Sequence, residues 1–452
     1  MSTPARAAGG EPGTRGPGGA GGAVAAWLGR PLTSLHLVLG VFGLLTALGL
    51  VMVLSASSVN AYAAGGSSYG VFFRQLAFAG VGAVLFWVGL RVPPRRLRAA
   101  SPWLLGACLV LLAAVLVPGL GAEVNGSRSW FRVGGVSLQP SELTKIALAL
   151  WGAHVLVRHR PAPARWRQAL MPLVPVALLI FALVVAQPDL GTTISLMVVV
   201  IALLWFACAP AGLMALLATG GVLAAVLLGV VASYRQSRIT AFLDPEGSDP
   251  LGPAYQARQA LYSLADGGVL GSGLGQGRAK WSYLPNADND FIFAIIGEEL
   301  GFLGAFAVVG LFVTLAYTGL RVAWRNTDPW IRVVASTLSV WLVVQAAINI
   351  GYVVGLLPVT GIPLPLVSSG GTSLALALFA GGLLANFARH ESEAAAVLRT
   401  HGQGRLARAL GLPLPVAAAR TAGSRPAASG PADSRPDRFL PITRARSGGP
   451  RR

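Results

Sequence analysis

The sequence has little charge, almost no cysteine and almost no lysine. Only 12% of its 452 residues are charged, 54% are hydrophobic, and the mean hydropathy is +0.64. These proportions exclude an ordinary soluble domain, because so few polar side chains cannot cover the water-exposed surface of a chain of this length. We therefore expect a polytopic membrane protein.

The shortage of cysteine excludes two further classes. Cys108 and Cys208 are the only cysteines and both fall inside apolar runs, so neither a disulfide framework nor a cysteine metal site is expected. We expect both thiols to be buried and inert. Lysine is equally scarce, since only Lys145 and Lys280 occur among the 35 basic residues, and each lies inside a polar motif described below.

Acidic residues are also few, which leaves a net charge of +18. In a soluble protein this excess would suggest nucleic acid, but here the arginines cluster in short connections and in the two tails. The clusters at 91–98, 158–167 and 321–332 are explained by membrane orientation and anionic lipid, so no nucleic-acid partner is expected. The positive-inside rule makes these connections and both termini cytoplasmic, and it places segments 119–141, 233–290 and 357–371 outside.

Apolar runs predict an all-α architecture of about ten transmembrane helices. The expected spans are 36–56, 71–90, 101–118, 143–157, 170–186, 192–209, 211–232, 291–320, 332–356 and 372–388. The predicted domains are a disordered cytoplasmic tail over 1–30, a membrane domain over 31–390, and a basic, disordered cytoplasmic tail over 391–452 that begins as an amphipathic helix. A large extracellular loop separates helices seven and eight, and its residues 253–268 are predicted to form an interfacial helix.

Carboxylates concentrate at the start of the eighth span, in the stretch LPNADNDFIFAIIGEELG over residues 284–301. Ionised groups beside a membrane-spanning helix are costly unless they face a wet cavity or a partner, so this stretch indicates a functional site. Asp290 is the leading catalytic candidate, and a structural N-cap is its alternative role. Glu298 lies about 12 Å along the helix, too far for the usual carboxylate pair of a glycosidase. Asp288, Glu298 and the upstream Lys280 are candidates for substrate binding at the same site.

A second polar motif, NGSRSWFRVGGVSLQPSELTK over residues 125–145, surrounds a glycine-rich turn and the start of the fourth span. Two interpretations fit it. One is a salt-bridged helix start with an interfacial tryptophan, and the other is the wall of a cleft for an anionic substrate such as a lipid-linked phosphate. The substrate-binding candidates in this motif are Arg128, Trp130, Glu142 and Lys145.

Two more motifs fall at the predicted outer face. Asp189 in QPDLG is expected to cap a helix, and it is also a candidate for substrate binding. Residues 356–376, LLPVTGIPLPLVSSGGTSLAL, end in a glycine-rich helix start that fits anion binding and simple capping equally well. Its candidates for substrate binding are Ser368, Ser369, Gly370 and Gly371.

The motifs NGSRSWF, QPSELTK, KWSYLP with NDFIFAIIGEELG, and GLLPVTGIPLPLVSSGGTS occur in an order that resembles the SEDS family (shape, elongation, division and sporulation). The resemblance covers roughly residues 36–390 and is greater to actinobacterial division members than to elongation members. The chain departs from the family where Pro-Glu-x-His-Thr-Asp is common, since residues 285–290 read Pro-Asn-Ala-Asp-Asn-Asp. Any role of that Glu or His is absent here or shifted to Asp288.

The resemblance implies a peptidoglycan glycosyltransferase that polymerises lipid II into β-1,4 glycan strands at the outer face of the cytoplasmic membrane, at the division septum. It implies a cognate class B penicillin-binding transpeptidase and other division-machinery proteins as partners, and it places the family's essential aspartate at Asp290. Because lipid II is α-linked, the reaction inverts the anomeric carbon. Asp290 would deprotonate the attacking hydroxyl, while Arg128, Lys145, Lys280 or a divalent cation (Mg²⁺ or Mn²⁺) neutralises the departing pyrophosphate.

Three alternatives remain open on the sequence alone: a lipid II transporter, an elongation-type paralogue and a non-catalytic scaffold of the division machinery. A transporter typically has charges near mid-membrane and two similar halves with broken helices. Here the charges lie at the predicted outer helix ends and no clear repeat is visible, which favours the enzyme.

Overall fold

The computed structural model describes residues 22, 26–63, 65–124, 126–134, 136–158, 166–231, 238, 240–244, 253–281 and 284–415. Most of the two predicted tails lies outside these residues, so the predicted domain boundaries stay predictions.

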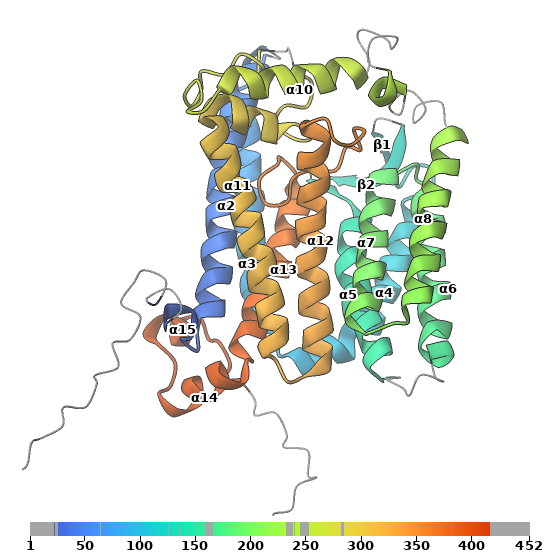
Figure 1. The fold of residues 1–452 in the computed structure, drawn as a ribbon, viewed down its shortest axis with the longest axis vertical. Coiled ribbons are helices and arrows are strands. Elements are labelled where there is room, and N and C mark those ends of the chain that lie inside the picture. The colour runs from blue at the N-terminus through green and yellow to red at the C-terminus, as the bar shows by residue number, and fades with distance from the viewer. Residues whose placement is uncertain are drawn as a thin grey trace, which may run out of the picture. The chain divides into compact units, whose positions relative to one another are not determined.

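Within the described residues, ten long helices occupy the positions of the ten predicted spans (Figure 1). They are α2 (Thr33–Ala63), α3 (Gly70–Arg91), α4 (Pro94–Ala114), α5 (Pro140–Arg158), α6 (Trp166–Val185), α7 (Leu190–Phe206), α8 (Ala211–Val231), α11 (Ile292–Arg325), α12 (Pro329–Val353) and α13 (Gly371–Arg389). Six of them, α2, α3, α4, α11, α12 and α13, are long and apolar enough to cross a membrane. For α5 to α8, spanning stays a prediction.

Shorter helices also appear among the described residues. The predicted helix in the large loop is confirmed as α10 (Pro253–Gly267), which crosses the ends of α11 and α12 in Figure 1. After α13 come α14 (Ser392–Thr400) and α15 (Arg405–Ala409). The helix α14 has the predicted amphipathic character, because Ala394, Ala395 and Leu398 are buried.

A small antiparallel sheet lies between α4 and α5, where the sequence had predicted only a glycine-rich turn. It consists of β1 (Ala122–Val124), β2 (Ser127–Val133) and β3 (Val136–Leu138), in that order. Gly126 and Gly134 close the two hairpins with φ of 76° and 57°, a conformation that glycine adopts without strain. Strands this short carry too little alternation to be recognised from the sequence.

Close packing of α3 against α13 fixes the start of α13. A Cβ on Gly382 would lie 2.2 Å from the carbonyl oxygen of Phe86, and one on Gly89 would lie 3.0 Å from that of Phe379. Small residues let the backbones of membrane helices approach in this way. The contact brings the Ser-Ser-Gly-Gly turn before α13 next to the first turns of α3, where Gln75 Nε2 donates to Ser368 O at 3.1 Å.

The eighth span, α11, is broken at Gly301, whose φ of 69° and ψ of −168° are not helical. A break in a helix leaves backbone donors and acceptors without intrahelical partners. The loop after α10 supplies them. The N–H groups of residues 272 and 273 donate to the carbonyls of Glu298 and Glu299, and the N–H groups of residues 302 and 303 donate to the carbonyls of residues 268 and 269. Residues 268–273 therefore complete the hydrogen-bond ladder of α11.

The two cysteines differ in exposure. Cys108 is buried in α4, as predicted, but the prediction is wrong for Cys208, which is exposed. Cys208 follows α7 in a turn with φ of 61°, where the chain reverses toward α8. An apolar run in the sequence does not tell which of its residues will face outward at such a turn.

We expect Gly301→Ala to lower the free energy of unfolding by on the order of 3 kcal/mol. The added Cβ would lie 2.3 Å from the amide nitrogen of Gly271, and the backbone conformation disfavours alanine. The matched control is Gly310→Ala in the same helix, where no atom lies within 4 Å of the new Cβ. Thermal unfolding in detergent should show a loss for the first variant alone, and equal midpoints would contradict this account of the break.

Candidate active site

Asp290 lies in the loop that leads into α11, and neighbouring elements hold this loop through its backbone. The carbonyl of Asp290 accepts hydrogen bonds from Asn349 Nδ2 at 2.9 Å and Tyr352 Oη at 2.8 Å, both on α12. Ser368 Oγ donates to the carbonyl of Asn289 at 2.7 Å. The loop is thus fixed between the end of α12 and the turn before α13.

The Asp290 side chain does not act as a helix cap. The N-cap of α11 is Phe291, and no side chain caps this helix. The Oδ1 atom of Asp290 is buried and has no hydrogen-bond partner among the described residues. A buried polar atom without a partner is costly, which favours a functional role over the structural one.

Burial raises the pKa of the Asp290 carboxyl from 3.8 to about 6, because the charged form loses hydration. The guanidinium of Arg238 lowers this pKa and the charge of Asp288 raises it, both by less than burial. Asp290 is therefore a stronger base than an ordinary aspartate and is still mostly ionised at pH 7, as a general base requires.

Two cavities meet at Asp290, and each contains basic side chains. The first, of about 430 Å³, is formed by β2, the starts of α5, α7 and α13, α12, and the loops before α11 and α13. The second, of about 380 Å³, is formed by the start of α3, strands β2 and β3, and the same two loops. The residues common to both are Trp130, Asn289, Asp290, Gly361, Ser369 and Gly370.

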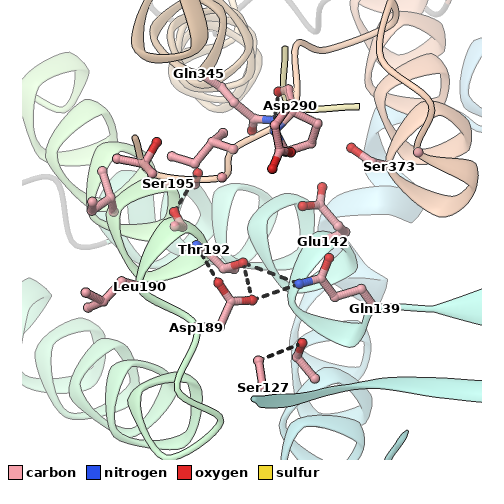
Figure 2. Close-up of a pocket in the computed structure, with 18 of the residues that line it drawn as sticks. Ser127, Gln139, Glu142, Asp189, Leu190, Thr192, Ser195, Asp290, Gln345 and Ser373 are labelled. Carbon is pink, nitrogen blue, oxygen red and sulfur yellow. Dashed lines mark hydrogen bonds between the residues drawn. The ribbon is translucent and has the colours of Figure 1, made fainter. Parts of the chain in front are cut away.

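The first cavity contains a buried ion pair. Lys145 Nζ lies 2.8 Å from Glu142 Oε1 and also donates to Gln345 Oε1 at 3.3 Å. The same ammonium lies 4.8 Å from the centre of the Trp341 ring. Figure 2 shows Glu142, Gln345 and Asp290 around this cavity. The predicted pairing of Glu142 with Lys145 is confirmed, and both residues also line the cavity.

Asp189 caps a helix, as predicted, and it also lines the first cavity. It caps α7, because Oδ1 accepts from the N–H of Thr192 at 3.0 Å, and Oδ2 accepts from Thr192 Oγ1 at 2.7 Å. Gln139 Nε2 donates to the same Oδ2 at 2.8 Å, as Figure 2 shows. The capped helix start also lines the first cavity. The capping prediction is confirmed, and a substrate contact stays a prediction.

Serine side chains of the turn before α13 hold the Asp290 loop, and no side chain caps α13. Ser369 Oγ donates to Asp288 Oδ2 at 2.7 Å, so Asp288 is already bound. Gly370 is the N-cap of α13 and lines both cavities, and Gly371 lines the second. A Cβ on Gly371 would lie 2.5 Å from the ring of Phe78, so the close approach of α3 requires glycine there.

Five predicted site residues line neither cavity, namely Arg128, Lys280, Asp288, Glu298 and Ser368. Arg128 pairs with Glu123 at 3.6 Å at the edge of the sheet. Lys280 pairs with Glu299 at 3.0 Å in a buried position. Glu298 accepts hydrogen bonds from the N–H groups of residues 278 and 279. The structure therefore does not bring Arg128, Lys145 and Lys280 together as a pyrophosphate site.

Other arginines border Asp290 instead. Arg74 and Arg132 line the second cavity, Arg238 lines the first, and Arg238 Nη1 donates to the carbonyl of Val359 at 3.0 Å. Arg74 could have been found as a charge inside a predicted span, which usually marks a functional position. Arg132 was visible only as part of its motif, because its position depends on the unpredicted sheet.

A divalent cation would need ligands from the substrate at this site. No three His, Cys, Asp or Glu side chains come together in the described part of the chain. Magnesium in phosphate-processing sites commonly uses one or two carboxylates together with substrate phosphates. Asp290 fits the protein share of such a site, so Mg²⁺ or Mn²⁺ remains a prediction.

The fold and the site define a helical membrane protein in which an aspartate of raised pKa, Asp290, lies where two cavities lined by arginine meet. A family model described as a cell cycle protein, for FtsW, RodA and SpoVE, matches residues 35–393. The chain belongs to this family.

Relatives and solved structures agree with this membership. The proteins named probable peptidoglycan glycosyltransferase FtsW from Mycobacterium tuberculosis and Mycobacterium bovis are each 51% identical over 86% of this chain and 74% of their own length. Stage V sporulation protein E of Bacillus subtilis is 40% identical over 77% of this chain and 94% of its own. A chain of a peptidoglycan synthase complex and the crystal structure of Thermus thermophilus RodA are each 28% identical over 78% of this chain. Their TM-scores are 0.64 and 0.59, and the matches cover 97% and 96% of their own chains.

We expect Asp290→Asn to stabilise the protein at pH 7.5 by on the order of 2–3 kcal/mol. The raised pKa means that the folded state binds the proton more tightly than the unfolded state. The free energy of unfolding of the wild-type protein therefore decreases as the pH rises from about 4 to about 6, whereas that of the Asn variant does not. Thermal unfolding should show a gain at pH 7.5 that vanishes near pH 4. Asp328→Asn at the N-cap of α12 is the control and should change little, and a destabilised Asp290 variant would contradict the assignment.

Proposed function

We propose that this chain is a peptidoglycan glycosyltransferase that polymerises lipid II during cell division. The observation that carries the proposal is the unpartnered Oδ1 atom of Asp290 at the junction of two cavities. Polymerisation joins two sugar units, so a base placed between two cavities can contact the nucleophile in one while the leaving group occupies the other. Family membership and the names of the relatives support the same reaction.

In this mechanism Asp290 accepts the proton of the attacking 4-hydroxyl as the oxygen forms a bond to the anomeric carbon. The bond from that carbon to the pyrophosphate breaks on the opposite face, so the α-linked donor gives a β-1,4 product. A sugar hydroxyl is a poor nucleophile while it keeps its proton, and general-base assistance is typically worth about 10² to 10⁴ in rate. The raised pKa of Asp290 suits this transfer.

The leaving pyrophosphate is assigned to the second cavity. Arg74 and Arg132 line it, and neither makes an ion pair with another described residue. Guanidinium groups bind phosphate oxygens through two parallel hydrogen bonds. By contrast, the ammonium of Lys145 in the first cavity is already paired with Glu142. The first cavity is therefore assigned to the sugar that attacks.

The proposal includes a partner and an orientation. A similar solved chain comes from a peptidoglycan synthase complex that coordinates polymerization and crosslinking, which supports a cognate transpeptidase of the penicillin-binding class as partner. Both termini are proposed to be cytoplasmic, which puts Asp290 and both cavities at the outer face. Location at the division septum and contacts with other division proteins are part of the same proposal.

Asp290→Asn should lower glycan-strand formation from purified lipid II by at least about 100-fold, because Asn keeps the shape but is no base. As the pH is lowered, the wild-type rate should reach half its plateau at about pH 6 and should then fall about tenfold for each further pH unit. Gel analysis of the glycan product, with the transpeptidase present, measures both effects. Asp328→Asn should retain activity because Asn caps as well as Asp. Near-normal synthesis by the Asp290 variant would place the base elsewhere, with Asp288 next to test.

Arg132→Gln and Arg74→Gln should each lower kcat/KM for lipid II by about tenfold to 100-fold, because a charge-assisted contact to phosphate is lost. Arg128→Gln is the matched control for Arg132. It lies on the same strand, pairs with Glu123 and lines neither cavity, so its effect should stay within about twofold. Binding of undecaprenyl pyrophosphate to the same variants separates the pyrophosphate site from catalysis. Equal losses for Arg128 and Arg132 would refute the assignment.

A further inference from the structure

A buried polar cluster lies outside both cavities, where α2, the first section of α11 and the loop after α10 meet. We call it the Lys280 junction, and it consists of Lys280, Glu299 and Ser55. Lys280 Nζ lies 3.0 Å from Glu299 Oε1 and 3.3 Å from Ser55 Oγ. Ser55 Oγ donates to the Glu299 carboxylate at 2.7 Å. The side chains of Lys280 and Glu299 are 3% and 0% exposed.

We propose that Lys280 is a positioning residue for Asp290 and acts through Glu299 without touching the substrate. Neither residue lines either of the two cavities at Asp290, although the sequence had predicted that Lys280 contacts the pyrophosphate. The effect on turnover rests on the proposed polymerase activity. The placement of the loop can be measured independently of that activity.

The break in α11 allows the Lys280 junction to determine the orientation of the helical section before Gly301. The section before Gly301 starts at Ile292, two residues after Asp290, so the orientation of this section determines the position of Asp290. Because the helix is interrupted, the rest of α11 does not fix this section through a continuous ladder. Its far end is held by loop residues instead, through the carboxylate of Glu298 and the carbonyls of Glu298 and Glu299.

The attachment of this helical section to the loop depends on Lys280, because Lys280 neutralises the buried charge of Glu299. A buried carboxylate without its cation is strongly unfavourable, whereas removing both charges of a buried pair is often nearly neutral. Without Lys280, Glu299 would have to take up a proton, admit water or move. Each of these outcomes disturbs the short helical section that begins beside Asp290. Removing the Glu299 charge as well should relieve the disturbance.

The chain contains a matched pair for comparison. Lys145 and Glu142 are also a buried lysine and glutamate, paired at 2.8 Å, but both line the first cavity. A pair that contacts substrate loses its contacts when both members are neutralised. A pair that only positions a loop does not.

The first experiment compares Lys280→Met, Glu299→Gln and the double variant in lipid II polymerisation. The single variants should lower kcat by at least about tenfold at a KM within about twofold of wild type, and the double variant should recover to within about threefold. The double variant Lys145→Met with Glu142→Gln should stay impaired. A Lys280 double variant as inactive as its single variants, a KM raised tenfold, or equal rescue of both pairs would overturn the proposal.

The second experiment measures the loop directly and needs no activity. In a Cys208→Ser background, the alkylation rate of Asp290→Cys should change at least about fivefold on adding Lys280→Met and return on adding Glu299→Gln, while the buried Cys108 stays unreactive. If Lys280→Met does not fold, Ser55→Ala keeps both charges and should give a smaller change of the same kind. An unchanged alkylation rate would overturn the proposal. If the alkylation rates of the Asp290→Cys variants change and return as expected while the wild-type protein makes no glycan from lipid II, the proposed function fails and the junction stands.

Discussion

A broken helix in a membrane protein must find partners for the backbone groups that the break exposes, and this constraint organises the end of the structure that contains Asp290. The break at Gly301 frees carbonyls and N–H groups that residues 268–273 then bind. That binding ties the loop after α10 to α11 and leaves a short helical section directly after Asp290. The Asp290 loop is therefore followed by a short helical section that is held separately from the rest of α11, because the helix is interrupted at Gly301.

The same requirement for partners distinguishes Asp290 from every other carboxylate near the site. Asp288 is bound by Ser369, Asp189 by Thr192 and Gln139, Glu142 by Lys145, and Glu298 by two backbone amides. Asp290 alone of these has a buried oxygen without a partner among the described residues. Such an atom lowers the stability of the fold, and the hydrogen bonds from Asn349 and Tyr352 to the backbone carbonyl of Asp290 hold the residue in place. A general base needs both properties, a free oxygen and a fixed backbone.

The sequence predicts the helices well because a span of about 20 apolar residues is a strong and local signal. It also predicts α10 and the cap formed by Asp189, which depend on neighbouring residues. It does not predict contacts between distant segments. Lys280 meets Ser55 across 225 residues, and nothing local distinguishes a lysine that binds a buried glutamate from one that faces a cavity. Arg128 and Arg132 are equally ambiguous until the short sheet fixes which of them borders Asp290.

Lysine and arginine occupy different kinds of position near the site, and the difference follows from the chemistry of their side chains. Both lysines are buried and each is paired with one glutamate, a task that suits a compact charge on a flexible stem. The arginines that border Asp290 stand at cavity walls, where a planar guanidinium can bind two phosphate oxygens at once. A lysine in place of Arg132 would keep the charge but lose the paired geometry. Both lysines of this chain therefore stand where a single charge is buried against one glutamate, while Arg74 and Arg132, which line the second cavity, are the residues that we propose bind phosphate.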